Sequence, residues 1–88
     1  MDESKKVGLE DLKRILVERV GLPAEDIPDD LTTTFEELGL DSLAFMEIAL
    51  AVEQEYGLQV DEEDAQHITT LGEALDYANS RLAEEASA

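Results

Sequence analysis

The residues from Leu38 to Glu47 surround the serine of this chain whose position points most clearly to chemistry. A turn is expected at Gly39, and strong helix formers follow, so a helix should open at Asp41 or Ser42. A serine hydroxyl there lies at the positive end of the helix, where an attached phosphate would be stabilised. On position alone, plain helix capping is the commoner role. Ser42 is therefore a candidate modification site with an ordinary structural alternative.

The sequence lacks most of the residues that the usual catalytic sites require. The chain has no cysteine, which excludes thiol nucleophiles, disulfides and thiolate metal sites. A serine hydrolase needs a base oriented beside its nucleophile, and no oxyanion loop accompanies His67, the single histidine. His67 is therefore expected to be a surface or interhelical residue. No catalytic residue is assigned.

Carboxylates are too abundant for their pairing to indicate acid–base catalysis, since 23 of the 88 residues are acidic. Residues 26–30 and 61–64 lack the glycine and the terminal glutamate of a calcium loop. No Gly-rich phosphate loop is present either. No specific metal site is expected.

The net charge is −17, from 6 basic and 23 acidic residues. Residues 1–20 are neutral overall, and Arg81 is the only base in residues 21–88. Nucleic-acid binding requires the opposite sign and is excluded, whereas basic protein partners would be attracted. No apolar run is long enough to span a membrane, and the first residues do not resemble a signal peptide, so a cytoplasmic location is expected.

The length predicts one domain covering residues 1–88, with an ordered core over about residues 7–83 and frayed ends. Apolar spacing predicts a first helix from Leu9 to Val20, stopped by Gly21. Residues 21–40 form a long connection, with a capped turn at Thr34 and Glu37. Its expected apolar anchors are Ile27, Leu31, Phe35, Leu38 and Leu40.

A second helix should run from about Ser42 to Tyr56, ended by Gly57. It carries two apolar lines. The line expected to face the core comprises Phe45, Ile48, Ala49, Val52 and Tyr56. The other comprises Leu43, Met46 and Leu50, and is expected to form a partly exposed contact surface, or alternatively to close the core.

A short helix is expected over about residues 61–66 with Asp61 as its cap. The last helix should start at Thr70, where Thr70 and Glu73 match a capping box, and keep its apolar spacing to Leu82. The predicted fold is an all-α bundle of three main helices and one short helix, with a long first loop.

Residues 35–43, Phe-Glu-Glu-Leu-Gly-Leu-Asp-Ser-Leu, resemble the phosphopantetheine attachment site of acyl carrier proteins. In that family the serine between the aspartate and the leucine carries the arm, which implies Ser42, flanked by Asp41 and Leu43. Residues 49–57 look like the end of the family's second helix, and residues 61–71 look like its third helix and the entry to its fourth. The likeness extends from Leu9 to Leu82.

The resemblance implies a four-helix acyl-carrier-like bundle that is not an enzyme. It also implies covalent 4′-phosphopantetheine, transferred from coenzyme A by a separate phosphopantetheinyl transferase, on a monomeric protein. The partners would be ketosynthase and acyltransferase-type enzymes with basic docking surfaces. The docking residues implied on the second helix are Leu43, Met46, Glu47, Leu50 and Glu53. An acyl-chain cavity is implied at Phe35, Ile48, Ala49, Val52, Ile68 and Leu75.

The pathway is less sharply indicated. Residues 43–47 look like carriers of dissociated polyketide synthases, whereas residues 61–71 look more like fatty-acid carriers. A start at Met1 without Pro/Ala-rich linkers favours a free-standing carrier. Asp41 follows Leu40 where peptidyl carriers tend to show a Gly-Gly pair, which disfavours that class. We favour a polyketide carrier, with a fatty-acid carrier as the alternative. The competing class is an acidic helical adaptor without a prosthetic group.

Overall fold

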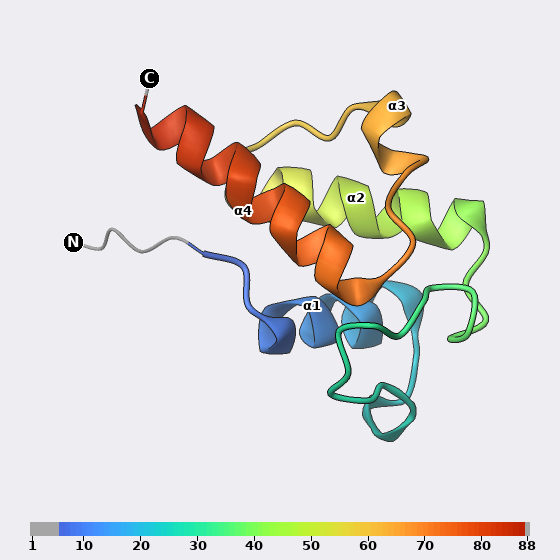
Figure 1. Cartoon of the computed structure of the whole chain (residues 1–88). Coiled ribbons are helices and arrows are strands. Elements are labelled where there is room, and N and C mark those ends of the chain that lie inside the picture. The colour runs from blue at the N-terminus through green and yellow to red at the C-terminus, as the bar shows by residue number, and fades with distance from the viewer. Residues whose placement is uncertain (1–5, 88) are drawn as a thin grey trace.

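The computed structural model describes residues 6–87, with side chains described as far as residue 84. The predicted all-α plan is confirmed, with three main helices, one short helix and a long connection (Figure 1). The α-helices are α1 (Leu9–Ile15), α2 (Ser42–Tyr56), α3 (Glu62–Ala65) and α4 (Leu71–Ser87), and the shorter helical turns are η1 (Leu16–Val20) and η2 (Ala24–Asp26). None of the described helices is long and apolar enough to cross a membrane.

The first predicted helix is present but changes its winding. It begins as α1 and finishes as the π-helical η1, in which the N–H groups of Gly21 and Leu22 both donate to the Leu16 carbonyl. Gly21 then ends the helix in the left-handed region at φ 87°, which glycine adopts without the Cβ penalty of other residues.

The long connection is fastened to the start of α4 by backbone hydrogen bonds. The Leu71 and Gly72 N–H groups donate to the carbonyls of Thr33 and Leu31, and the Phe35 N–H donates to the Thr69 carbonyl, at 2.9–3.0 Å. Of the predicted anchors, Ile27 and Phe35 are buried and Leu38 and Leu40 are half-buried. The side chain of Leu31 is instead exposed. Its prediction as a core anchor was wrong, because Leu31 is fixed through its backbone.

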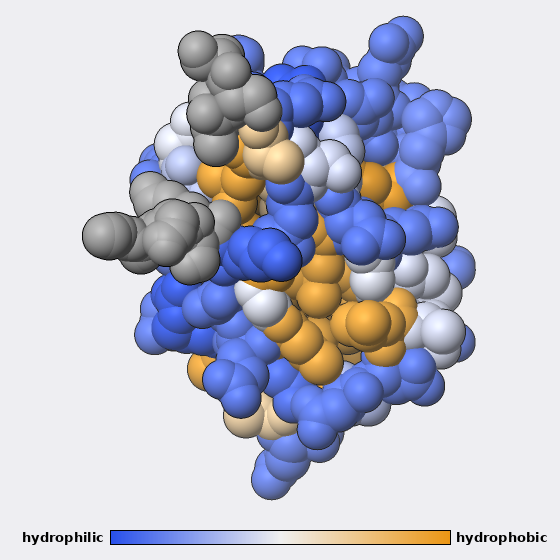
Figure 2. Space-filling view, turned by 60° about the vertical axis from the view of Figure 1, so that its left-hand side comes forward, coloured by the Kyte–Doolittle hydropathy of each residue, from blue (hydrophilic) through white to orange (hydrophobic). Residues whose placement is uncertain are grey.

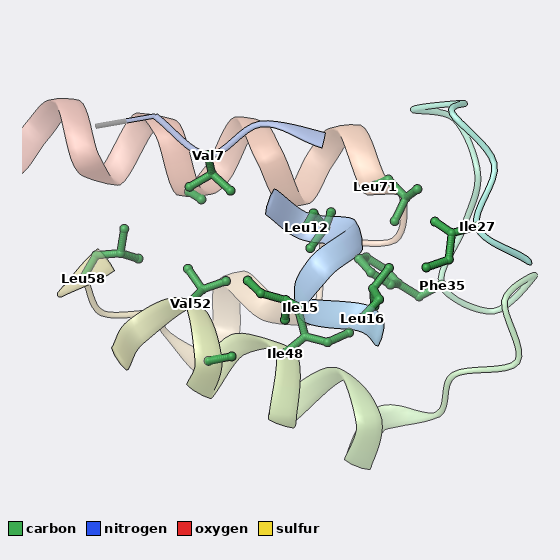
Figure 3. Packing of buried hydrophobic residues seen from close by; sticks show 12 residues of the cluster. Val7, Leu12, Ile15, Leu16, Ile27, Phe35, Ile48, Val52, Leu58 and Leu71 are labelled. Atoms are coloured by element: carbon green, nitrogen blue, oxygen red, sulfur yellow. The ribbon is translucent and has the colours of Figure 1, made fainter. Parts of the chain in front are cut away.

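The core lies between α1–η1, α2, α4 and the connection, as the labelled side chains in Figure 3 show. On α2, Ile48 and Val52 are buried as predicted, while Phe45, Ala49 and Tyr56 are half-buried. Ala51 was not predicted to face inwards, yet it is fully buried. Since α2 packs against η1, a small side chain on that face allows the two backbones to approach closely.

Helix α3 has few bonds of its own and is tied to α4 by one side chain. The Tyr77 hydroxyl donates to the Asp64 carboxylate at 3.1 Å and accepts the Asp61 N–H at 3.3 Å. Asp61 occupies the predicted cap position, but its side chain makes no capping hydrogen bond. A four-residue helix is not stable alone, so these bonds and its packing hold it.

Helix α4 starts as predicted. The Thr70 hydroxyl accepts the Glu73 N–H at 3.1 Å, and the Glu73 carboxylate accepts the N–H groups of Thr69 and Thr70 at 2.7 and 3.3 Å. The helix extends past Leu82 to Ser87. Fraying of the ends stays a prediction, and residues 1–5 and 88 lie outside the described residues.

The polar coat over this small core is incomplete. Figure 2 shows a face on which hydrophobic residues reach the surface between hydrophilic ones. A chain of this length buries only about 60–65% of the surface that its unfolded form exposes. The segment before α1 covers part of the core, because the Asn79 side chain bonds both the N–H and the carbonyl of Val7, at 2.7 and 3.0 Å.

The Glu73 cap predicts a pH dependence of stability. The hydrogen bonds from the Thr69 backbone, the Thr69 hydroxyl and the Thr70 backbone lower the pKa of Glu73 below its ordinary 4.5. A depressed folded-state pKa adds stability above the unfolded value, which is lost as the pH falls through the folded value. Glu73→Gln mimics the protonated side chain. We therefore expect it to lower the free energy of unfolding at pH 7, with the difference from the parent shrinking as the pH falls below 4.5 and vanishing once it has passed the lowered pKa of folded Glu73.

Urea unfolding at a series of pH values measures this difference. Glu63→Gln is the control, because it removes the same charge from an exposed residue outside the α4 cap. A loss of equal size and pH dependence in Glu63→Gln would contradict the capping explanation.

Candidate functional site

A short turn delivers the chain to Ser42. The Phe35 carbonyl accepts the N–H groups of Leu38 and Leu40, at 3.1 and 3.0 Å, and Gly39 takes a left-handed conformation at φ 79°. The predicted cap before this turn is present, since the Thr34 hydroxyl accepts the Glu37 N–H at 3.0 Å. The turn is thus closed on Phe35, whose own N–H is bonded to Thr69.

Helix α2 begins at Ser42, as predicted, and Asp41 caps it. The Asp41 backbone is extended and its carboxylate accepts the Ala44 N–H at 2.9 Å. Because Asp41 makes the cap, the Ser42 hydroxyl is not used for capping. Ser42 is exposed, at the end of a helix where unpaired N–H groups and the dipole favour a phosphate. The alternative that Ser42 is merely a capping serine is wrong.

His67, the histidine considered as a base for Ser42, does not lie beside it. His67 is exposed, as expected, and is absent from the lining of the pocket beside Ser42.

A pocket of about 470 Å³ opens beside Ser42, between the turn, the start of α2 and the region of α3. The polar residues lining it are Thr34, Glu36, Asp41, Ser42, Glu62, Gln66 and Thr69. Its apolar residues are Phe35, Leu40, Phe45, Met46, Ala65 and Ile68. A mixed surface of this size suits an elongated group with both amide and hydrocarbon parts.

The five predicted docking residues gather in a groove of about 240 Å³ between α2 and α3, which we call the α2–α3 groove. They are Leu43, Met46, Glu47, Leu50 and Glu53, and the rest of the lining comes from Ala49, Val60, Glu62 and Ala65. Leu43, Met46 and Leu50 are 73%, 46% and 51% exposed. The alternative that this second line closes the core is therefore wrong.

The carboxylates of α2 differ in the groups that they contact. Glu47, at the groove, is exposed. Glu53 accepts the Val60 N–H at 2.9 Å and so also holds the segment leading to α3. Glu55 faces α1, where its hydrogen bond to Arg14 at 2.8 Å lowers the pKa of Glu55 and raises that of Arg14. Arg14 of α1 thus pairs with a carboxylate of α2 that does not line the groove, and the charged residues that do line the groove are all carboxylates.

The predicted acyl-chain residues divide between two spaces. Ile48, Ala49, Val52, Ile68 and Leu75 line a small, mostly apolar cavity of about 30 Å³. Phe35 is not part of that lining and borders the pocket beside Ser42 instead. The bundle interior is small, and the pocket beside Ser42 is the larger space.

Sequence reasoning missed the far walls of both openings. Glu62 and Ala65 of α3 line the pocket and the groove, and Gln66 and Thr69 line the pocket. These residues are about twenty or more positions from Ser42 in the chain, so no local pattern links them. The sequence offered a signal only for the near wall of the pocket. The capped turn at Thr34 comes shortly before the exposed start of α2, so it was expected to lie beside that helix start.

Comparison with known proteins agrees with this geometry. Residues 10–78 match the family described as phosphopantetheine attachment site. The acyl carrier protein of Nitratidesulfovibrio vulgaris is 35% identical over 72 residues, which cover 82% of this chain and 93% of that protein.

Solved carrier structures share the fold. The apo acyl carrier protein of the actinorhodin system from Streptomyces coelicolor superposes with a TM-score of 0.83 at 38% identity, covering 93% of this chain and 98% of that one. An acyl carrier protein from Thermotoga maritima gives a TM-score of 0.81 at 25% identity, covering 88% of each chain. Acyl carrier proteins are carriers and not enzymes. The sequence match spans most of the chain, and the fold agrees with it, so this chain belongs to the acyl carrier protein family, whose members carry covalently attached phosphopantetheine.

Proposed function

We propose that Ser42 is the attachment residue and that the protein shuttles acyl groups between enzymes of a dissociated polyketide synthase. The observation that supports attachment at Ser42 is the geometry at the start of α2. Asp41 makes the helix cap, which leaves the Ser42 hydroxyl exposed beside a pocket of about 470 Å³. The proposal includes a cytoplasmic location and a monomeric state.

The residues present fit phosphopantetheine. The start of α2 suits its phosphate, and the pocket offers both polar and apolar side chains along its walls. When attached, the group supplies a terminal thiol that holds acyl chains as thioesters. Asp41 orients the first turn of α2, and Leu43 presents an apolar contact next to Ser42 that a transferase can recognise.

The attachment predicts a mass gain. Incubation of the purified chain with coenzyme A and a phosphopantetheinyl transferase should add one phosphopantetheinyl group, read by intact mass. Ser42→Ala should gain nothing, because it removes the attacking hydroxyl. Ser80→Ala is the control, since it removes a serine on α4. A gain that persists in Ser42→Ala would refute the assignment, and an unmodified parent chain would favour the adaptor alternative.

The docking part of the proposal rests on the α2–α3 groove. Three exposed apolar residues lie beside carboxylates, and a small apolar patch with a charged rim suits brief, steered association with a basic enzyme surface. The negative charge of residues 21–88 adds to this steering.

Substitutions in the groove should slow delivery of cargo without unfolding the protein. Glu47→Lys reverses a rim charge, and we expect the acyl-transfer rate to a partner enzyme to fall by about tenfold. Met46→Ala should lower it several-fold through lost contact area. Glu25→Lys makes the same charge change on η2, outside the groove. Glu25→Lys should keep the parent rate, and unchanged rates in both groove variants would exclude docking there.

The polyketide assignment is supported by the likeness to the actinorhodin carrier, at 38% identity. A fatty-acid role is the alternative. The loaded carrier should extend chains faster with a ketosynthase of a dissociated polyketide synthase than with one from fatty-acid synthesis. Kinetics with both enzymes under matched conditions measure this, and the reverse order would favour the fatty-acid role.

A further inference from the structure

Helix α3 contributes to the far wall of both openings beside α2, yet it is only four residues long. Glu62 and Ala65 line the pocket beside Ser42 and also the α2–α3 groove. A helix of one turn cannot keep its shape or its place by its own hydrogen bonds. The position of this wall therefore depends on the groups that fasten α3 to the longer helices.

Two consecutive backbone N–H groups fasten the entry to α3, and they are held by different helices. The Val60 N–H donates to the Glu53 carboxylate of α2 at 2.9 Å. The Asp61 N–H donates to the Tyr77 hydroxyl of α4 at 3.3 Å. Because neighbouring residues are bonded to α2 and to α4, the start of α3 is fixed relative to both.

Tyr77 uses its hydroxyl twice. While it accepts the Asp61 N–H, it donates to the carboxylate of Asp64, the third residue of α3, at 3.1 Å. The Arg81 guanidinium lies 5.9 Å from the centre of the Tyr77 ring, within the range of a cation–π contact. Tyr77 does not line the α2–α3 groove, so an effect of its hydroxyl on docking there would act through α3.

Glu53 differs from Glu47, the other carboxylate that α2 contributes to the groove. Glu47 is exposed, whereas Glu53 is half-buried and accepts the Val60 N–H. Val60 and Glu62 both line the groove. The Glu53 carboxylate therefore holds part of the groove wall in place, in addition to the negative charge that it contributes.

We propose that Glu53 and Tyr77 are positioning residues for docking, which together hold α3 where it shapes the α2–α3 groove for a partner enzyme. Glu53 acts mainly through its bond to the Val60 N–H, and its charge is the smaller part of its effect. Tyr77 acts from α4, outside the groove lining. The inference rests on the proposed docking of partner enzymes in this groove.

Substitutions of Glu53 separate hydrogen bonding from charge. Glu53→Ala removes the acceptor for the Val60 N–H, whereas Glu53→Gln removes the charge and keeps an acceptor oxygen. The assay is acyl transfer from the loaded carrier to a ketosynthase of a dissociated polyketide synthase. We expect Glu53→Ala to raise the KM for the carrier about fivefold with kcat near the parent value, because one bond that shapes the docking surface is lost. Glu53→Gln should stay within about twofold of the parent KM.

A second variant removes the bond to α4. Tyr77→Phe keeps the ring and deletes the hydroxyl, and it should also raise the KM about fivefold at unchanged kcat. Tyr56→Phe is the matched control, because it deletes the hydroxyl of another half-buried tyrosine that does not line the groove. The control should keep the parent KM, so a general effect of losing a tyrosine hydroxyl is separated from a shift of α3.

Amide hydrogen exchange gives a readout that does not depend on a partner enzyme. The Val60 N–H should exchange at least about fivefold faster in Glu53→Ala, and the Asp61 N–H should do the same in Tyr77→Phe, because each loses its acceptor. Continued protection of Ile48, which is buried on α2, shows that the bundle of each variant is folded.

A parent KM in either Glu53→Ala or Tyr77→Phe would overturn the inference. So would an equal rise of KM in Glu53→Gln and Glu53→Ala when only the alanine variant speeds exchange of the Val60 N–H, because docking would then follow charge. Equal KM values in Tyr56→Phe and Tyr77→Phe would also contradict it.

Failure of groove docking itself is recognised separately. Glu47→Lys and Met46→Ala are measured in the same ketosynthase assay, and both residues line the groove. If these two variants keep the parent rate, docking in the groove is refuted and the positioning role falls with it. If they are slow while Glu53→Ala and Tyr77→Phe keep the parent KM, docking stands and only the positioning role is refuted.

Discussion

The backbone hydrogen bonds that join residues 31–35 to residues 69–72 hold the surroundings of Ser42 together. They are antiparallel in sense, with an isolated bridge between Thr34 and Thr70. They fix Phe35, on which the turn before α2 closes, and they fix the residues from which α4 starts. Residues 6–87 form no sheet, yet a few strand-like bonds fasten the long connection to the start of α4, and with it the turn before α2 and one wall of the pocket.

Helix α2 presents different residues to the core, to the α2–α3 groove and to the pocket. Ile48, Ala51 and Val52 face the core, Leu43, Met46 and Leu50 face the α2–α3 groove, and Ser42 begins the helix beside the pocket. This division explains why α2 is more apolar than one buried stripe requires. Glu55 pairs instead with Arg14 of α1 and Arg19 of η1, so the charged residues of α2 that line the groove, Glu47 and Glu53, are both carboxylates.

Much of this arrangement was predictable because its signals are local. Helix periodicity, Gly21 and Gly57 as stops, and the Thr70–Glu73 cap predicted the main helices within a residue or two, except for the end of α4, which runs past Leu82 to Ser87. The inward position of Ala51 was not predictable, since a small residue is buried only if a neighbouring helix approaches it. The pocket and the groove likewise depend on where α3 lies. The bonds from Tyr77 to α3 join residues 13 and 16 positions apart, and no periodic pattern records them.

Small size links the pocket to the core. A domain of 88 residues has few side chains available to enclose a ligand, so an open interior would expose the apolar contacts that keep it folded. Phe45 contributes to the core and to the pocket at once, because it packs against the buried residues and also lines the pocket. Phe35 sets that ring in place and is itself set by the connection. The same backbone bonds that present Ser42 therefore also hold Phe35 against Phe45 at the border of its pocket.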